Sequence, residues 1–218
     1  MKQLFTEMKK HLLEKEDLVF VTVVASSGAV PRGTGARMLV GRRGRICGTV
    51  GGGMVEYRSE QMALEALASH SSKMKQFILR RNEVEDIGMI CGGDVTLYFK
   101  YIEGQDSKWL AFCEEALKLF DRPEQAWLIS DLSEDGELGI YSKGRGLIGI
   151  ENKSGLIDLI KGRSCKFELD CRKYYAEEMM TPGYVHIFGG GHVSRELVPV
   201  LTHLGFRCKV YEDREEFL

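Results

Sequence analysis

The sequence has little proline and no excess of either charge. Only 4 of its 218 residues are proline, so the chain does not have the composition of a flexible linker. Its 30 basic and 32 acidic residues nearly cancel. A non-specific nucleic-acid binder needs a basic excess to displace counterions. The composition therefore argues against nucleic acid as a partner.

Long apolar runs are also missing. The longest run covers residues 18–25 (LVFVTVVA), whereas a membrane-spanning helix needs about 20 apolar residues. The first 20 residues alternate charged and apolar side chains, unlike a secretory signal. We therefore expect no membrane partner and a cytoplasmic location.

Common catalytic and metal-binding signatures are absent as well. The six cysteines form no C-x-x-C pair, and without an export signal they are expected to be reduced thiols. The chain has no H-E-x-x-H motif, no Walker lysine and no Ser-His-Asp order. These absences favour a binding or delivery protein over an enzyme, although they leave an enzymatic role open.

The pattern of apolar residues predicts an α/β fold. Helical spacing predicts helices over residues 3–14 and 106–120 and another that begins after Gly53. Runs of branched residues predict strands over 18–25, 37–41, 45–50, 74–80 and 94–102, with weaker strands at 126–130 and 138–150. We assign residues 1–150 to an N-terminal α/β domain. Residues 151–183 are expected to be a connector with a short helix near 170–179.

After Pro182 and Gly183 the pattern changes to that of a βαβ unit. The strand VHIF, the turn GGGHVS, the helix RELVPVLTHLGF and the strand KVYED follow one another. Residues 184–218 thus predict the start of a Rossmann-like domain. A nucleotide-binding fold of this type needs about twice that sheet. The rest is missing from this chain, or another subunit supplies it, or the segment adds to the N-terminal sheet. We favour the first explanation and expect the domain to be incomplete. Its exposed sheet edge favours pairing with a second copy in a homodimer.

Glycine is abundant, with 25 residues gathered in clusters. The first cluster, SSGAVPRGTGARMLV, spans residues 26–40. Gly33 and Gly35 allow backbone turns and the close approach of a ligand. Arg32 and Arg37 carry charged forks that suit a phosphate or another oxyanion. The alternative is a flexible loop with two solvated arginines.

The second cluster, GTVGGGMVEY, joins a strand to a helix through Gly51, Gly52 and Gly53. Free amides at a helix N-terminus favour an anion. Glu56 falls in the first helical turn. It is either a capping acid or a side chain that contacts a ligand or metal.

The third cluster, GMICGGDV, places Cys91 before Gly92 and Gly93. A thiol beside bare backbone amides can have a lowered pKa and act as a soft metal ligand or a persulfide carrier. The alternative is a small buried cysteine in a tight turn.

The fourth cluster approximates the dinucleotide fingerprint G-x-G-x-x-G. Gly189 and Gly191 match it, and Ser194 replaces the third glycine. Glu212 and Asp213 lie 23 and 24 residues beyond Gly189, close to the usual spacing of the acid that contacts the ribose. This cluster predicts a phosphate-cradling turn that could take NAD(P) or another nucleotide.

The four clusters in this order resemble the xanthine dehydrogenase accessory factor family, called XdhC/CoxI. The matching stretches are GAVPRGTGARMLV, GTVGGGMVE, GMICGGDV, and GGGHV with the later EDREEF. The resemblance implies an N-terminal α/β domain followed by a Rossmann-like domain. It also implies a chaperone that binds and protects the molybdenum cofactor and delivers its sulfurated form to a xanthine dehydrogenase-type molybdenum hydroxylase. The sulfur would come from a cysteine desulfurase.

The resemblance also implies a set of site residues. The cofactor is an anionic pyranopterin phosphate with an oxo-molybdenum centre, which suits amide nests and arginines. Cys91, Glu56 or His192, the first residue of its helix, could face the metal. The candidate cofactor-binding residues are Arg32, Gly33, Gly35, Arg37, Gly51, Gly52, Gly53, Glu56, Cys91, Gly92, Gly93, Gly189, Gly191, His192, Glu212 and Asp213. Cys91 is the candidate metal ligand, and no catalytic residue is assigned.

Two alternatives remain at this point. An NAD(P)-dependent oxidoreductase would use the Rossmann-like segment for hydride chemistry, but no proton-transfer pair is evident. A nucleotide-sensing module would bind an adenine nucleotide there without chemistry and without molybdenum.

Overall fold

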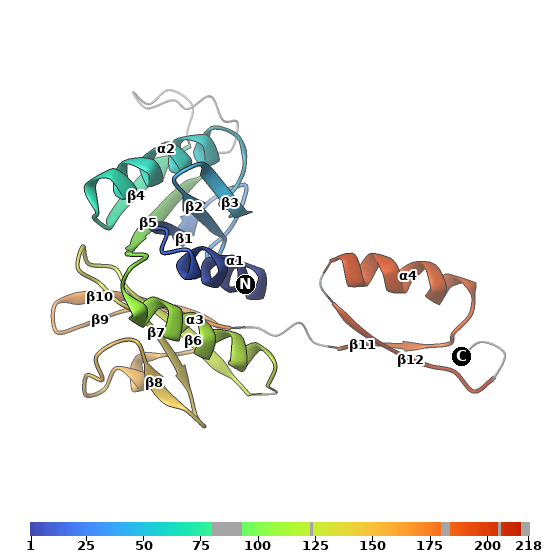
Figure 1. Cartoon of the computed structure of the whole chain (residues 1–218). Helices are drawn as coiled ribbons and strands as arrows, with labels where there is room; N and C mark the ends of the chain where they lie inside the picture. The colour runs from blue at the N-terminus through green and yellow to red at the C-terminus, as the bar shows by residue number, and fades with distance from the viewer. Residues whose placement is uncertain (80–92, 123, 180–183, 205, 215–218) are drawn as a thin grey trace. The chain divides into compact units, whose positions relative to one another are not determined.

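The computed structural model describes residues 1–79, 93–122, 124–179, 184–204 and 206–214. The chain divides into two compact units, Met1–Met179 and Met180–Leu218 (Figure 1). They are called the N-terminal unit and the C-terminal unit below. The described residues mix helices and sheets, which confirms the α/β class.

The first of two sheets in the N-terminal unit, sheet A, is antiparallel and has the order β3-β2-β1-β5-β4. Its strands are β1 (Leu18–Ser27), β2 (Arg37–Gly41), β3 (Gly44–Thr49), β4 (Lys73–Ile78) and β5 (Asp94–Ile102). The central β1 is buried over its first seven residues. Its continuous apolar run fits this position, because a strand that is covered on both faces needs no polar alternation.

Helices cover both faces of sheet A. On one face lies α2 (Gly53–Ser69) (Figure 1). Its residues Val55, Ala63 and Ala66 pack against the strands. On the other face lie α1 (Lys2–Leu13) and α3 (Ser107–Phe120), which contact each other. There Phe5 of α1 lies about 6 Å from the rings of three phenylalanines, Phe20, Phe112 and Phe120. The apolar helix faces seen in the sequence are therefore core faces.

The second sheet, sheet B, is antiparallel and has the order β8-β7-β6-β10-β9. Its strands are β6 (Ala126–Asp131), β7 (Leu138–Ser142), β8 (Gly146–Ile148), β9 (Ser164–Leu169) and β10 (Arg172–Glu178), and the short helix η1 covers Ile157–Leu159. The connector expected over 151–183 is corrected here, because β9 and β10 complete this sheet. The short helix expected near 170–179 is wrong, since β10 takes its place and pairs with β6.

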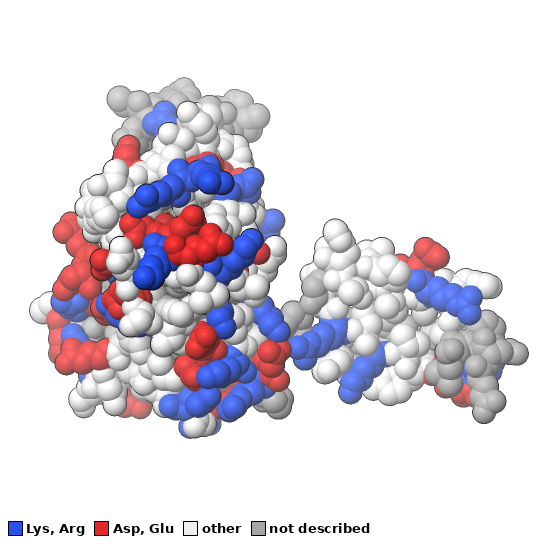
Figure 2. All heavy atoms as spheres, in the orientation of Figure 1, with Lys and Arg blue, Asp and Glu red and all other residues white. Residues whose placement is uncertain are grey.

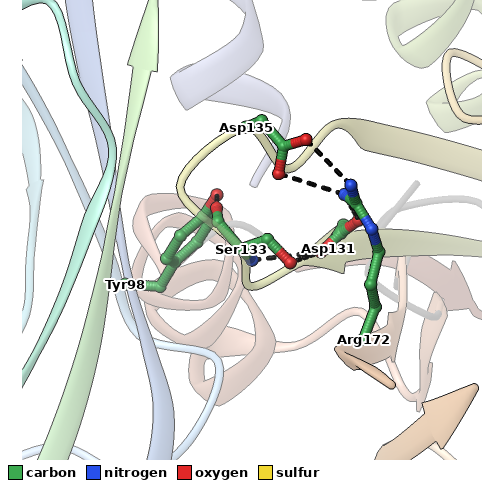
Figure 3. Close-up of polar contacts among 5 residues, drawn as sticks. All are labelled: Tyr98, Asp131, Ser133, Asp135 and Arg172. Carbon is green, nitrogen blue, oxygen red and sulfur yellow. Dashed lines mark hydrogen bonds and ion pairs between the residues drawn. The ribbon is translucent and has the colours of Figure 1, made fainter. Parts of the chain in front are cut away.

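The loop between β6 and β7 is held from both sheets (Figure 3). Arg172 of β10 forms ion pairs with Asp131 at 2.9 Å and with Asp135 at 2.8 Å. Tyr98 of β5 donates a hydrogen bond from its hydroxyl to the carbonyl oxygen of Ser133, at 2.9 Å. This loop therefore joins sheet A to sheet B.

The C-terminal unit has the βαβ order that the sequence predicts. Strands β11 (Tyr184–Phe188) and β12 (Arg207–Tyr211) are parallel, with α4 (His192–His203) between them. Among its described residues no apolar side chain is buried, and Phe188 and Val193 are 82% and 80% exposed. Its described part thus has no hydrophobic core of its own.

Charges are mixed on the visible surface. On the face shown in Figure 2, Lys and Arg side chains lie beside Asp and Glu side chains rather than forming one positive area. No helix among the described residues is long and apolar enough to span a bilayer.

Candidate functional site

The three glycine clusters of the N-terminal unit come together at one end of sheet A. A Cβ atom on Gly51 would lie 3.2 Å from Cβ of Pro31. A Cβ atom on Gly93 would lie 2.6 Å from the carbonyl oxygen of Ala29 and would also clash with that of Ser27. The second and third clusters therefore pack directly against the first. The close approach explains glycine at both positions.

The glycines that begin α2 leave open space beside the backbone. Gly52 and Gly53 have φ angles of +72° and +57°, a conformation that favours glycine. No other atom lies within 4 Å of the point where a Cβ of Gly52 would be. The first amides of a helix have no partner within the helix. The start of α2 thus leaves room for a ligand beside its backbone.

Glu56 folds back onto the loop that precedes its helix. Its carboxylate accepts hydrogen bonds from the Thr49 hydroxyl and from the amides of Val50 and Gly52, at 3.3 and 3.2 Å. Arg45 lies 3.3 Å away. Burial alone would raise the pKa of Glu56, but these hydrogen bonds and Arg45 outweigh it and lower the pKa. The geometry favours the capping role, because the chain's own acid binds two of the amides.

Arg37 is held inside the N-terminal unit. Its Nη1 forms an ion pair with Glu177 and donates to the carbonyl oxygen of Gly35 at 2.9 Å. The hydroxyl of Tyr175 donates to the other oxygen of Glu177 at 2.6 Å. The Arg37 side chain is 2% exposed. Burial lowers the pKa of Arg37 to about 10, so the guanidinium stays charged at neutral pH.

One edge of the Arg37 guanidinium is unused. Within the described part of the chain, its Nε and Nη2 are buried and have no hydrogen-bond partner. This pair of N–H groups forms a fork that can bind two oxygens of one anion. Arg32, by contrast, is exposed on the same loop and has no ion-pair partner among the described residues.

Cys91 and Gly92 lie outside the described residues, so the predicted metal ligand stays a prediction. Within the described ranges, no group of three His, Cys, Asp or Glu residues is placed to hold a metal ion.

The turn of the C-terminal unit has the expected strand–turn–helix form. Gly189 has a φ of +105°, and its amide donates to the carbonyl oxygen of Tyr211 at 2.8 Å. The hydroxyl of Ser194 donates back to the carbonyl oxygen of Gly189. A Cβ on Gly191 would meet no atom within 4 Å. His192 is exposed at the first position of α4.

The two acids at the end of β12 have different surroundings. Glu212 accepts hydrogen bonds from the amide of Gly190 at 2.5 Å and from Nε of Arg214 at 2.9 Å. The Arg214 side chain and the Gly190 amide together lower the pKa of Glu212. The side chain of Asp213 is 96% exposed. Asp213 is therefore the acid that is accessible to a ligand.

Glu177 and Tyr175 were missed by the sequence interpretation, which placed them in a connector. Both residues belong to β10, which places them beside Arg37. Glu177 follows Arg37 in the sequence by 140 positions. The only local signal was the alternation of Cys165, Phe167 and Leu169 with polar residues, which is typical of a strand.

Comparison with known proteins identifies the N-terminal part. Residues 11–78 match the XdhC and CoxI family. The match includes the first two glycine clusters and confirms the resemblance that they carry.

Two curated relatives come from Escherichia coli (strain K12). The uncharacterized protein YqeB is 36% identical over 97 residues, which are 44% of this chain and 17% of YqeB. The molybdenum cofactor insertion chaperone PaoD is 37% identical over 89 residues, which are 39% of this chain and 27% of PaoD. The chain thus spans less than a third of the length of either relative.

A solved structure shares the fold. A crystal structure described as a xanthine dehydrogenase from Bacillus halodurans matches with a TM-score of 0.74 at 18% identity. The match covers 97% of this chain and 63% of that chain. At this identity the likeness concerns the fold alone.

Proposed function

We propose that this XdhC/CoxI-family chain is an accessory protein of the molybdenum cofactor, which it binds at the three converged glycine loops of the N-terminal unit. The observation that carries the proposal is the convergence itself, which gathers bare backbone and open space at the start of α2. The family match and the similarity to PaoD, whose name states cofactor insertion, support it.

The residues present suit an anionic cargo. The exposed Arg32 supplies a positive charge without a partner in the described part of the chain. The unused edge of Arg37 supplies two further donors that nothing described satisfies. Gly52 leaves room beside the backbone at the first turn of α2. These groups would bind oxygen atoms of the anionic cofactor and shield it. The cofactor's own metal centre supplies the redox chemistry once it reaches a target enzyme.

The wider role is part of the same proposal. A molybdenum hydroxylase of the xanthine dehydrogenase type receives the cofactor, and a cysteine desulfurase supplies the sulfur. The protein acts in the cytoplasm as a homodimer and as a chaperone rather than as an enzyme with turnover.

The direct experiment is co-production with a molybdenum-cofactor pathway and purification without oxygen. Bound molybdenum and the oxidised pterin derivative are quantified per chain. Near-stoichiometric amounts of both are expected. A folded protein that retains neither contradicts the proposal.

Two glycine variants separate binding from backbone strain. Gly52→Ala adds a methyl group at the start of α2, where φ is +72°, and Gly146→Ala adds one in sheet B, where φ is +70°. In both positions the new Cβ meets nothing within 4 Å, and backbone strain should cost each variant about 1–3 kcal/mol, so pterin retention is compared between the folded variants. Only Gly52→Ala is expected to retain less pterin. Equal retention by the two variants would remove the loop from the site.

Nucleotide binding at the C-terminal unit is a second candidate, favoured by the turn at Gly189 and the exposed Asp213. Either an NAD(P)-dependent oxidoreductase or a nucleotide-sensing module would use it. Calorimetric titration with NAD(P) and with ADP, on wild type and on Gly191→Val, tests this. If neither nucleotide binds, or if the folded variant binds as well as wild type, the turn is structural.

A further inference from the structure

A surface pocket of about 240 Å³, open to solvent, lies beside the first glycine loop in the N-terminal unit. One wall is formed by the end of β1, which includes Ser26, and by Thr34 of the first glycine loop. The other wall is sheet B, with Ser164 and Lys166 of β9 and Tyr175 of β10. The second wall lies outside residues 11–78, which match the family.

The strand register places the sheet B groups on one face. Ser164 pairs with Glu177, and Lys166 pairs with Tyr175. Cross-strand partners and alternate residues of a strand share a face. The intervening Cys165 also lines the pocket, and its sulfur accepts a hydrogen bond from the Lys161 amide at 3.3 Å. Besides this sulfur, the pocket offers the hydroxyls and the ammonium group of Lys166.

The hydroxyls of Ser26 and Thr34 hold each other in place. Oγ of Ser26 and Oγ1 of Thr34 lie 3.2 Å apart and hydrogen-bond to each other. Only one of them can donate in that bond, so the other keeps a proton to donate into the pocket. The Tyr175 proton is committed to Glu177.

The charge that faces the pocket is positive. Lys166 has no ion-pair partner among the described residues, and both burial and the nearby Lys173 lower the pKa of its ammonium group. The acid on this wall, Glu177, is already neutralised by Arg37. An uncompensated ammonium group among hydroxyl donors is suited to an oxyanion.

We propose that this pocket is a phosphate site, in which Lys166 supplies the counter-charge and Ser26, Thr34 and Ser164 supply hydroxyl donors. Its ligand is inorganic phosphate or a phosphate monoester. The phosphate of the pterin is one such monoester, and that assignment alone rests on the proposed function.

The test uses the full chain and inorganic phosphate, followed by calorimetry and by phosphorus NMR. Wild type is expected to bind phosphate saturably. Lys166→Gln should weaken binding about tenfold or more, because one charged hydrogen bond is lost. Lys143→Gln is the matched control, since it removes the same charge from an exposed turn of sheet B. Ser164→Ala provides a second, smaller weakening that leaves the charge unchanged.

Two results would overturn the proposal. One is the absence of saturable phosphate binding by wild type. The other is an equal effect of Lys166→Gln and Lys143→Gln, which would indicate a non-specific charge effect.

The source of the phosphate is decided by competition on pterin-loaded protein. Release of the pterin by added phosphate in wild type, but not in Lys166→Gln, assigns the pocket to the cofactor's own phosphate. Phosphate binding without pterin release assigns it to free phosphate. Phosphate binding by a protein that never retains pterin supports the pocket and rejects the proposed function.

Discussion

Single residues in the first glycine loop are fixed by partners far away in the sequence. Gly35 has a φ of +92°, and a Cβ there would lie 2.5 Å from a carboxylate oxygen of Glu177. Gly33, two residues earlier, would place its Cβ 4.0 Å from the hydroxyl of Ser26. The sequence pattern does not distinguish the two glycines. In the structure, only Gly35 lies where a larger residue would clash.

Gly35→Ala should therefore destabilise the protein, and Gly33→Ala should not. Backbone strain and the clash with Glu177 are expected to lower the free energy of unfolding of Gly35→Ala by about 2 kcal/mol. Gly33→Ala should change it by at most about 0.5 kcal/mol. Urea denaturation of both variants measures the difference. Similar values for the two would show that Glu177 does not constrain the loop.

The buried pair of Arg37 and Glu177 predicts a non-additive pair of mutations. Removing one partner leaves a buried charge without compensation, so Arg37→Met or Glu177→Leu alone should cost about 3–5 kcal/mol. The double variant should cost less than the sum of the two, because no buried charge remains. A double-mutant cycle by urea denaturation measures the coupling. Additive effects would mean that the two side chains act independently.

At the scale of elements, local patterns predicted most of the fold. The helical faces of α1, α2 and α3 and the apolar run of β1 carry strong periodicity, and each forms as expected. The strands β9 and β10 were missed because they carry many charged residues. β9 is an edge strand and alternates exposed and half-buried residues. Its many polar residues made this strand-like alternation hard to recognise in the sequence.

The start of α2 predicts a pH dependence through Glu56. Since the pKa of Glu56 is lowered in the folded protein, its contribution to stability is present above its unfolded pKa, about 4.3. It is lost as the pH falls through the lowered pKa. At pH 7, Glu56→Gln should lower the free energy of unfolding by about 1–2 kcal/mol.

Urea denaturation of Glu56→Gln between pH 3 and 7 measures this effect. The difference from wild type should shrink as the pH falls from the unfolded-state pKa of Glu56 toward its lowered folded-state pKa. Glu65→Gln is the control on the same helix, because Glu65 is exposed and pairs with Lys73 at the surface, a contact worth at most about 1 kcal/mol. A pH-independent deficit in Glu56→Gln would mean that the charge of Glu56 is not what binds the loop.

At the scale of the whole molecule, the pairing of strands that are distant in the sequence could not be predicted. The junction of β1 with β5 and that of β6 with β10 join segments that are far apart in the sequence. Local periodicity contains no information about such partners. The convergence of the three glycine clusters is a result of the same pairing, since β5 carries Gly93 back to the loop that follows β1. Motifs could therefore suggest candidate site residues, but they could not show which of these residues lie close together.

The division at Met179 predicts how stability is distributed along the chain. All four hydrophobic clusters draw on residues up to Met179, and among the described residues none of the buried apolar side chains lies beyond it. A chain that ends after Met179 should thus keep its near-ultraviolet circular dichroism and its urea midpoint. A large drop in the midpoint would mean that the C-terminal unit stabilises the rest.

The same truncation should remove most of the exposed apolar surface. Phe188, Val193 and Leu204 are each more than half exposed in the C-terminal unit, and such surface binds the dye ANS. The full chain should therefore enhance ANS fluorescence more strongly than residues 1–179 do. Equal enhancement would place the dye-binding surface on the N-terminal unit, and the C-terminal unit would then have to bury these side chains against a partner in solution.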